Sequence, residues 1–272
     1  MTAPPIDTCQ RWELGRTSYR PAREVVDTRR FDVVEIDELT AKAFVEQHHY
    51  SRRYPAARFR FGLYELGELV GVAVFSQPFQ AKVITNAFPT LQQPTDGVEL
   101  GRFVLLDRVG ANGETWFLAR CFEQLAGRVL GVVSFSDPWE RATADERVIF
   151  PGHIGTIYQA ANARYRGLTD DSSLRILPDA TVFSNMASGK IRRHLTGWRS
   201  CVAELVRFGA APLDDEAPEQ ERIDWLERWR GELTRPMRHR GNHRYTWMLD
   251  RRRRREVPYG PERAYPKKAK AA

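Results

Sequence analysis

The sequence of 272 residues predicts an α/β fold in which helices flank a mixed, mostly antiparallel central sheet. Segments typical of strands alternate with amphipathic helical segments over residues 31–168. Residues 58–66 and 69–75 are joined by a tight turn at Gly67-Glu68, which is typical of an antiparallel hairpin. A strand–helix–strand step at residues 98–137 then predicts one parallel pair.

The first part of the chain carries clear local signals. Residues 31–36 favour a short strand, and residues 37–47 favour a helix with Asp37 as its N-cap. The connection at residues 76–96 contains three prolines and is too long for a turn, so a functional loop is expected there. Three apolar side chains alternate along the first hairpin strand and are expected on one face: Phe59, Phe61 and Leu63.

The second part continues the alternation of strands and helices. A Gly-rich turn at residues 107–114 separates a strand at 98–106 from a helix at 115–125, and a buried strand follows at 129–135. The remaining expected elements are a helix at 156–164, a strand from 165, a strand core at 174–177, a helix at 184–195, an amphipathic helix at 219–233 and a strand at 244–249.

These patterns divide the chain into four parts. Residues 1–28 are expected to form an irregular arm, and residues 29–210 the main domain. Residues 211–250 are expected to add a helix and a late strand that pack on this domain, and residues 251–272 a basic, disordered tail.

Composition excludes several classes of protein. Hydrophobic residues make up 42% and charged residues 28%, which is typical of a globular protein rather than a disordered one. No run of 18 apolar residues occurs, so a membrane span is not expected. The first residues lack a signal-peptide pattern, and three widely spaced cysteines suit a reducing compartment, so a cytoplasmic protein is expected.

The net charge of +7 is unevenly distributed. Residues 235–272 hold 13 Lys/Arg and 3 Asp/Glu, whereas the rest of the chain is close to neutral. Such an end suits a polyanion, nucleic acid first, although a tail that only aids solubility is the alternative. The expected phosphate contacts are Arg192, Arg193, Arg251, Arg252, Arg253, Arg254 and Arg255. Tyr245 and Trp247 are candidates for stacking on a displaced base, and the alternative is that they belong to the core.

Four short motifs carry a resemblance to a known family. In chain order they are His49-Tyr50-Ser51, Glu99-Leu100-Gly101-Arg102, Ser134-Phe135-Ser136-Asp137 and Gly155-Thr156-Ile157-Tyr158. The element order is similar to the GNAT N-acyltransferase fold, and the motifs resemble the Mom family of phage DNA adenine modification proteins. The resemblance covers about residues 30–170, so residues 29–210 would be a GNAT-like catalytic domain.

This resemblance implies an activity. A Mom-like enzyme attaches a carbamoylmethyl group to N6 of adenine in double-stranded DNA and so protects phage or mobile-element DNA from restriction. It would then work in the host-cell cytoplasm. Two other functions stay open: an acyl-CoA-dependent N-acetyltransferase of a small-molecule or protein amine, and a noncatalytic DNA-binding protein.

The chemistry of N6 defines which residue types are needed. The amine is a poor nucleophile, because its lone pair is delocalised into the ring, so a base and donors for developing charge are required. Asp137 follows a buried strand, where pockets open in α/β sheets, and is a candidate base or amine binder; a turn aspartate before Pro138 is the alternative. Glu99 and Arg102 point to opposite faces unless a bulge at Gly101 resets the register, and a surface salt bridge is the alternative.

The other site candidates lie near helix ends. His49, with Tyr50 and Ser51, follows the first helix and is a candidate base or metal ligand. Tyr158 opens a later helix, and the resemblance to acyltransferases implies that it protonates the departing group. Tyr165 is a rival for that role, with core packing preferred.

Two cofactors are considered. The turn containing Arg108, Gly110, Ala111 and Gly113 partly matches the pyrophosphate-binding turn of GNAT enzymes, which makes acyl-CoA a candidate. The family resemblance raises a divalent metal such as iron. His239 and His243 are four residues apart, but the Gly-Asn between them argues against a helix that would align them as ligands.

Overall fold

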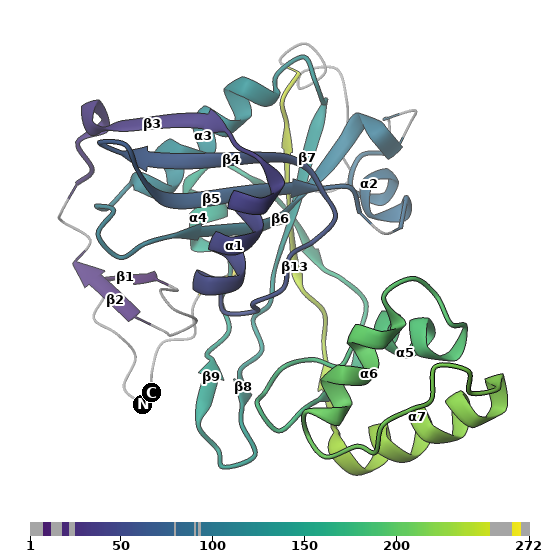
Figure 1. The fold of residues 1–272 in the computed structure, drawn as a ribbon. Coiled ribbons are helices and arrows are strands. Elements are labelled where there is room, and N and C mark those ends of the chain that lie inside the picture. The colour runs from purple at the N-terminus through teal and green to yellow at the C-terminus, as the bar shows by residue number, and fades with distance from the viewer. Residues whose placement is uncertain are drawn as a thin grey trace. The chain divides into compact units, whose positions relative to one another are not determined.

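In the computed structural model the chain forms two compact units (Figure 1). The residues that it describes are 8–11, 18–21, 25–78, 80–89, 91, 94–250 and 263–267. Unit 1 comprises residues 1–138, 152–169 and 242–272, and unit 2 comprises residues 139–151 and 170–241. This division differs from the expected boundaries, because unit 2 begins inside the range 29–210 that the sequence assigned to one domain.

Unit 1 is built on a seven-stranded sheet with the order β10-β13-β7-β6-β5-β4-β3. Every neighbouring pair is antiparallel except β6 with β7, which confirms the mixed, mostly antiparallel sheet and its one parallel pair. The strands are β3 (Phe31–Glu35), β4 (Ala57–Glu65), β5 (Glu68–Ser76), β6 (Gly97–Leu105), β7 (Gly131–Ser136), β10 (Arg164–Leu168) and β13 (His243–Met248).

Helices cover both faces of this sheet. The strand β5 is almost continuously apolar, as expected for a strand buried on both sides. Its Val72 and Val74 pack with α1 (Glu38–His48), while Ala73 and Phe75 pack with α3 (Gly113–Leu125). Asp37 caps α1 by accepting a hydrogen bond from the Thr40 amide at 2.9 Å, as predicted. The connection 76–96 contains a short helix, α2 (Lys82–Ala87), and α4 (Thr156–Ala160) follows β7 along the chain.

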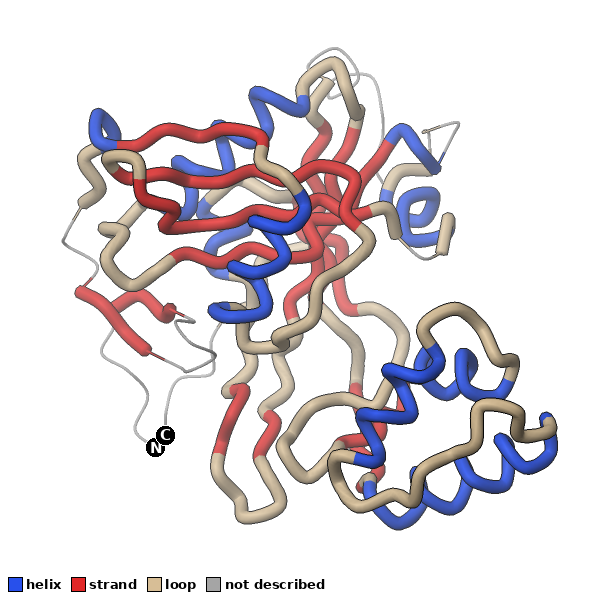
Figure 2. Tube along the Cα trace, viewed as in Figure 1, coloured by secondary structure: helices blue, strands red, loops and turns tan. Residues whose placement is uncertain are grey.

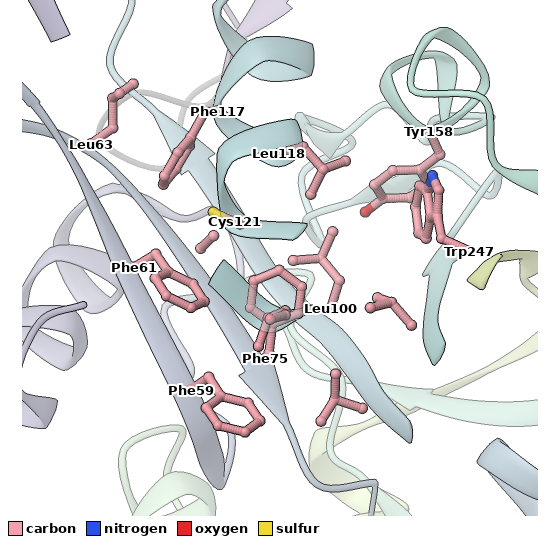
Figure 3. Packing of buried hydrophobic residues seen from close by; sticks show 14 of the residues in the cluster. Phe59, Phe61, Leu63, Phe75, Leu100, Phe117, Leu118, Cys121, Tyr158 and Trp247 are labelled. Carbon is pink, nitrogen blue, oxygen red and sulfur yellow. The ribbon is translucent and has the colours of Figure 1, made fainter. Parts of the chain in front are cut away.

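The largest core cluster lies on the α3 side of the sheet (Figure 3). Phe59, Phe61 and Leu63 all belong to it, which confirms their predicted common face. Tyr245 and Trp247 are also buried there, and the Trp247 ring meets the Tyr158 ring edge-on at 5.6 Å. The hypothesis that these two residues stack on a displaced base is therefore wrong, because their rings fill the core.

Unit 2 is mostly helix and loop (Figure 2). Its helices α5 (Asn185–Arg192), α6 (Trp198–Val206) and α7 (Glu219–Leu233) share one core, in which Leu226 and Ile191 are fully buried. Two short antiparallel pairs complete it: β8 (Arg141–Ala142) with β9 (Val148–Phe150), and β11 (Ser172–Ile176) with β12 (Arg235–His239).

Both ends of the chain differ from expectation. The predicted irregular arm contains an antiparallel pair, β1 (Thr8–Arg11) with β2 (Ser18–Pro21). In the predicted disordered tail, residues 263–267 lie against unit 1: Arg263 N donates to the Tyr165 carbonyl at 3.2 Å, and the Tyr265 hydroxyl to the Ala163 carbonyl at 2.6 Å. No helix among the described residues is long and apolar enough to cross a membrane.

Gly155 is a position where the fold requires glycine. Its φ is +71°, and an added Cβ would lie 2.7 Å from the Tyr245 ring and 3.0 Å from Ser136 Oγ. We expect Gly155→Ala to lower the free energy of unfolding by about 2–4 kcal/mol, because the left-handed backbone and the overpacking both cost energy. Gly127→Ala is the matched control, since Gly127 has φ +82° and open space around its Cβ position. Chemical denaturation of both variants checks this, and equal losses would contradict the steric argument.

Candidate active site

A bulge in β6 brings the first two site residues to the same face. In the pairing of β5 with β6, Val74 faces Arg102 and Phe75 faces Leu100, so Gly101 is the extra residue. The bulge at Gly101, on which a common face of Glu99 and Arg102 was conditional, is thus present, and the two residues share a face rather than diverging. Glycine suits this position because an added Cβ would come within 2.6 Å of Ser76 Oγ.

Glu99 and Arg102 are partly buried and influence each other electrostatically. Burial raises the pKa of Glu99, and the Arg102 charge opposes that rise. Two backbone carbonyls hold the guanidinium: Arg102 Nε donates to the Arg53 carbonyl at 2.7 Å, and Nη1 donates to the Gly101 carbonyl at 2.5 Å. The site therefore contains a fixed positive charge and a carboxylate with a higher proton affinity than in water.

His49 is buried and neutral. Its Nδ1 accepts a hydrogen bond from the Ser51 amide at 3.1 Å and lies 2.8 Å from Ser51 Oγ. Because Nδ1 is the acceptor, the neutral ring carries its proton on Nε2. Burial, and then the charges of Arg102 and His153, hold the pKa of His49 well below its usual range. His49 is thus a hydrogen-bond donor through Nε2 rather than a base.

Tyr158 belongs to the same group of side chains. Burial raises the pKa of Tyr158 to about 12, and its electrostatic neighbours are Tyr50, Glu99 and Arg102. Its hydroxyl is hydrogen-bonded to Ser134, whose own proton goes to the Leu100 carbonyl at 3.1 Å. The contact with Ser134 lowers the pKa of Tyr158, but burial outweighs it. The phenol keeps its proton at neutral pH.

The structure thus brings His49, Tyr50, Glu99, Arg102 and Tyr158 together in unit 1. Ser51 joins them by orienting the His49 ring. Asp137 follows the end of β7, and its backbone carbonyl accepts a hydrogen bond from the His153 amide at 2.8 Å. Tyr165 lies in the core, and its hydroxyl is hydrogen-bonded to His243 Nδ1 at 2.7 Å. This confirms the prediction that Tyr165 is a core residue.

Three residues near this group were not among the predicted site residues: Arg53, Ser134 and His153. Ser134 stands inside one of the four motifs, so the alternation of β7 could have placed it beside Tyr158. Arg53 contributes its backbone carbonyl, which accepts from Arg102, and His153 contributes a charge that lowers the pKa of His49. No local sequence pattern encodes either contribution.

Comparison with known proteins identifies the family. The model of the Mom protein family matches residues 30–267, most of the chain. The chain belongs to the Mom protein family. Membership in the Mom family indicates a transferase. No curated protein matches this chain in a sequence search. Among solved structures, a tandem GNAT protein from the clavulanic acid biosynthesis pathway, without AcCoA, is similar at 7% identity, with a TM-score of 0.41, over 81% of this chain and 99% of that chain.

The turn of this Mom family member that was predicted to bind acyl-CoA forms ion pairs and hydrogen bonds with other parts of the chain. Arg108 Nη2 pairs with Glu68 Oε2 at 2.5 Å, and its Nε lies 3.5 Å from Glu65 Oε2. The Ala111 carbonyl accepts from the Val26 amide, and the Gly113 amide donates to the Gly110 carbonyl. Glu114 is buried in the first turn of α3, where a pyrophosphate would require positive potential. These contacts fit a structural turn.

The residues present do not fit a metal held by His49. Because Nδ1 accepts from the Ser51 amide, the ring proton is assigned to Nε2, and in this tautomer His49 has no lone pair free for an ion. Among the described residues no group of three or more His, Cys, Asp or Glu is arranged to hold a metal ion. His239 and His243 lie on separate strands, β12 and β13.

The expected DNA contacts are only partly visible. Arg192 and Arg193 lie at the C-terminal end of α5 in unit 2, where Arg193 is exposed. Arg251–Arg255 lie outside the described residues.

The low pKa of His49 predicts how stability depends on pH. The unfolded imidazole takes up a proton near pH 6.5, whereas the folded one resists it, so the free energy of unfolding should fall as the pH drops below about 6.5. The contribution reaches about 1.4 kcal/mol per pH unit for one proton. Comparison with His49→Gln isolates it from His48 and His243, whose pKa values burial also lowers. Denaturation between pH 7.5 and 5 should show a shallower decline for the variant; parallel curves would contradict a depressed pKa at His49.

Proposed function

We propose that this protein transfers a carbamoylmethyl group to N6 of adenine in double-stranded DNA and thereby protects phage or mobile-element DNA from restriction. The observation that carries the proposal is the convergence of Glu99, Arg102, His49 and Tyr158 on one partly buried site in a chain of the Mom family. Because N6 of adenine lies within the base stack, the adenine has to be flipped out of the duplex to reach such a site.

The group transfer requires one acceptor and one donor of protons. With a donor of the form X–CH₂–CONH₂, the N6 lone pair forms a bond to the methylene carbon while the C–X bond breaks and its electron pair leaves with X. The amine proton passes to a carboxylate. Glu99 suits this role, because burial raises the proton affinity of its carboxylate above that of a free one. Asp137, at the end of β7, is the second carboxylate that we propose for binding the amine.

The other residues stabilise charge on the donor. Arg102, held by two backbone carbonyls, presents a fixed positive charge to the carbamoyl oxygen or to the leaving group. His49 offers its Nε2 proton as a neutral donor. Tyr158 protonates X, and for this its hydroxyl turns away from Ser134 toward the leaving group.

The two carboxylates provide the direct test. Genomic or plasmid DNA from cells expressing the protein is digested to nucleosides and analysed by mass spectrometry for a modified deoxyadenosine. We expect Glu99→Gln to lower its yield by about 10²-fold or more, since a general base contributes about 10²–10⁴-fold. Asp137→Asn should also lower the yield, because the carboxylate proposed to bind the amine is lost. Glu35→Gln is the control, because Glu35 is an exposed carboxylate of unit 1 paired with Arg128.

Absence of modified deoxyadenosine with the wild-type protein, together with tight acyl-CoA binding, would favour an acyl-CoA-dependent N-acetyltransferase. Salt-sensitive DNA binding with neither product nor acyl-CoA affinity would favour a noncatalytic DNA-binding protein.

The phenol is tested separately. We expect Tyr158→Phe to lower the yield of modified deoxyadenosine by about 10²-fold with little loss of folding, because the ring and its packing remain. Tyr245→Phe is the matched control: Tyr245 is also buried, burial raises its pKa to about 12, and its hydroxyl donates to the Ile154 carbonyl. A normal yield from Tyr158→Phe would remove the phenol from the reaction.

A further inference from the structure

Most ion pairs of unit 2 join one arginine to one carboxylate. Four of its arginines each have a carboxylate of their own within 2.8–3.1 Å, and these pairs are exposed. The pairs are Arg199 with Asp215, Arg207 with Asp179, Arg228 with Glu232 and Arg238 with Asp171. At such positions the positive charge is largely cancelled within the protein.

A second group of arginines in unit 2 is not matched in this way. Arg230 from α7 lies close enough to Arg175 from β11 and to Arg192 from α5 for both to repel its charge. Burial, and then the charges of Arg175 and Arg192, lower the pKa of Arg230, and Glu227 opposes this. Glu227 is also the carboxylate nearest to Arg192, with Oε1 3.8 Å from Nη2. Arg192 and Arg230 therefore share Glu227, and Arg175 adds a further positive charge close to Arg230.

The scaffold holds these arginines against their mutual repulsion. Arg222 Nη2 donates to the Arg192 carbonyl at 3.3 Å and its Nη1 to the Ala217 carbonyl, which ties the end of α5 to the start of α7. Ile191 and Leu226 are buried and anchor the same two helices in the core of unit 2. Ile191 directly precedes Arg192, and Leu226 lies four residues before Arg230. Packing and the Arg222 side chain therefore hold the backbone that carries Arg192, in addition to its ion pair with Glu227.

The cluster also has an unused donor. Arg192 Nε is buried and has no hydrogen-bond partner among the described residues. A buried N–H without a partner costs free energy, and an anion bound at the guanidinium fork would satisfy it. All three side chains are partly exposed, so an anion from solution can reach them.

We propose that Arg175, Arg192 and Arg230 together bind a phosphodiester group of the DNA backbone. The planar guanidinium fork matches two phosphate oxygens, and an excess of fixed positive charge favours a permanently ionised ligand. The proposal deepens the function proposed above and rests on it for the identity of the polyanion. It adds Arg175 and Arg230 to Arg192, which the sequence already gives as an expected phosphate contact.

The test compares two pairs of substitutions that change the net charge equally. Binding of a fluorescent mixed-sequence DNA duplex is measured between 50 and 300 mM NaCl for the full chain, for Arg175→Gln/Arg230→Gln, and for the control Arg199→Gln/Arg228→Gln. We expect the slope of log K against log[salt] to become shallower by about 1 in the cluster variant, as for the loss of one phosphate contact. The control should keep the slope of the unmodified chain, because its arginines are paired with Asp215 and Glu232.

A second readout shows whether the cluster variant still folds and which anion the site takes. Removing two mutually repelling charges should leave the melting temperature of the cluster variant equal to or above that of the unmodified chain. Inorganic phosphate at constant ionic strength should raise the melting temperature of the unmodified chain and not that of the cluster variant.

An unchanged salt slope would overturn the proposal, even with stabilisation by phosphate, since the cluster would then take free anions only. An equal loss of slope in the control would overturn it as well. Binding is measured without the group donor, so a missing modified nucleoside with this salt behaviour intact would contradict only the proposed reaction.

Discussion

The extra residue in β6 is the constraint on which the candidate site depends. In a regular strand Glu99 and Arg102, three residues apart, would point to opposite faces of the sheet. The bulge at Gly101 removes that difference, and the short distance to Ser76 Oγ explains why the extra residue has no side chain. One residue without a Cβ thus decides whether a carboxylate and a guanidinium act on the same ligand.

Burial sets the protonation states of the groups around the bulge. It raises the proton affinity of Glu99, keeps the phenol of Tyr158 protonated and keeps the imidazole of His49 neutral. Burial also lowers the pKa of Arg102, while Tyr50 and Glu99 oppose this effect and two backbone carbonyls hold the guanidinium. The result is one charged pair beside two neutral donors, an arrangement that water would not maintain.

The sequence predicted what depends on local pattern and missed what depends on distant partners. The amphipathic helix at 219–233 and the hairpin at 57–76 follow from periodicity and a turn, and both appear in the structure. By contrast, β13 inserts between β7 and β10, about 75–110 residues away from them in the chain, and this buries Tyr245 and Trp247 that alternation alone left open. Likewise, the sequence alone could not predict the bulge at Gly101. The bulge depends on the register of β6 against β5, which is a property of the pair of strands.

Charge shows the same limit. Residues 170–241 hold 12 Lys/Arg and 12 Asp/Glu, so a count along the chain indicates a neutral segment and directs attention to the basic C-terminal end. Ion pairing in unit 2 is uneven, however: carboxylates close to Arg199, Arg207, Arg228 and Arg238 neutralise those four, whereas Arg192 and Arg230 share Glu227 and Arg175 lies close to Arg230. An electrostatic field depends on which charges are paired in space. A binding surface for a polyanion can therefore lie in a segment of zero formal charge, provided that the fold concentrates the unmatched cations.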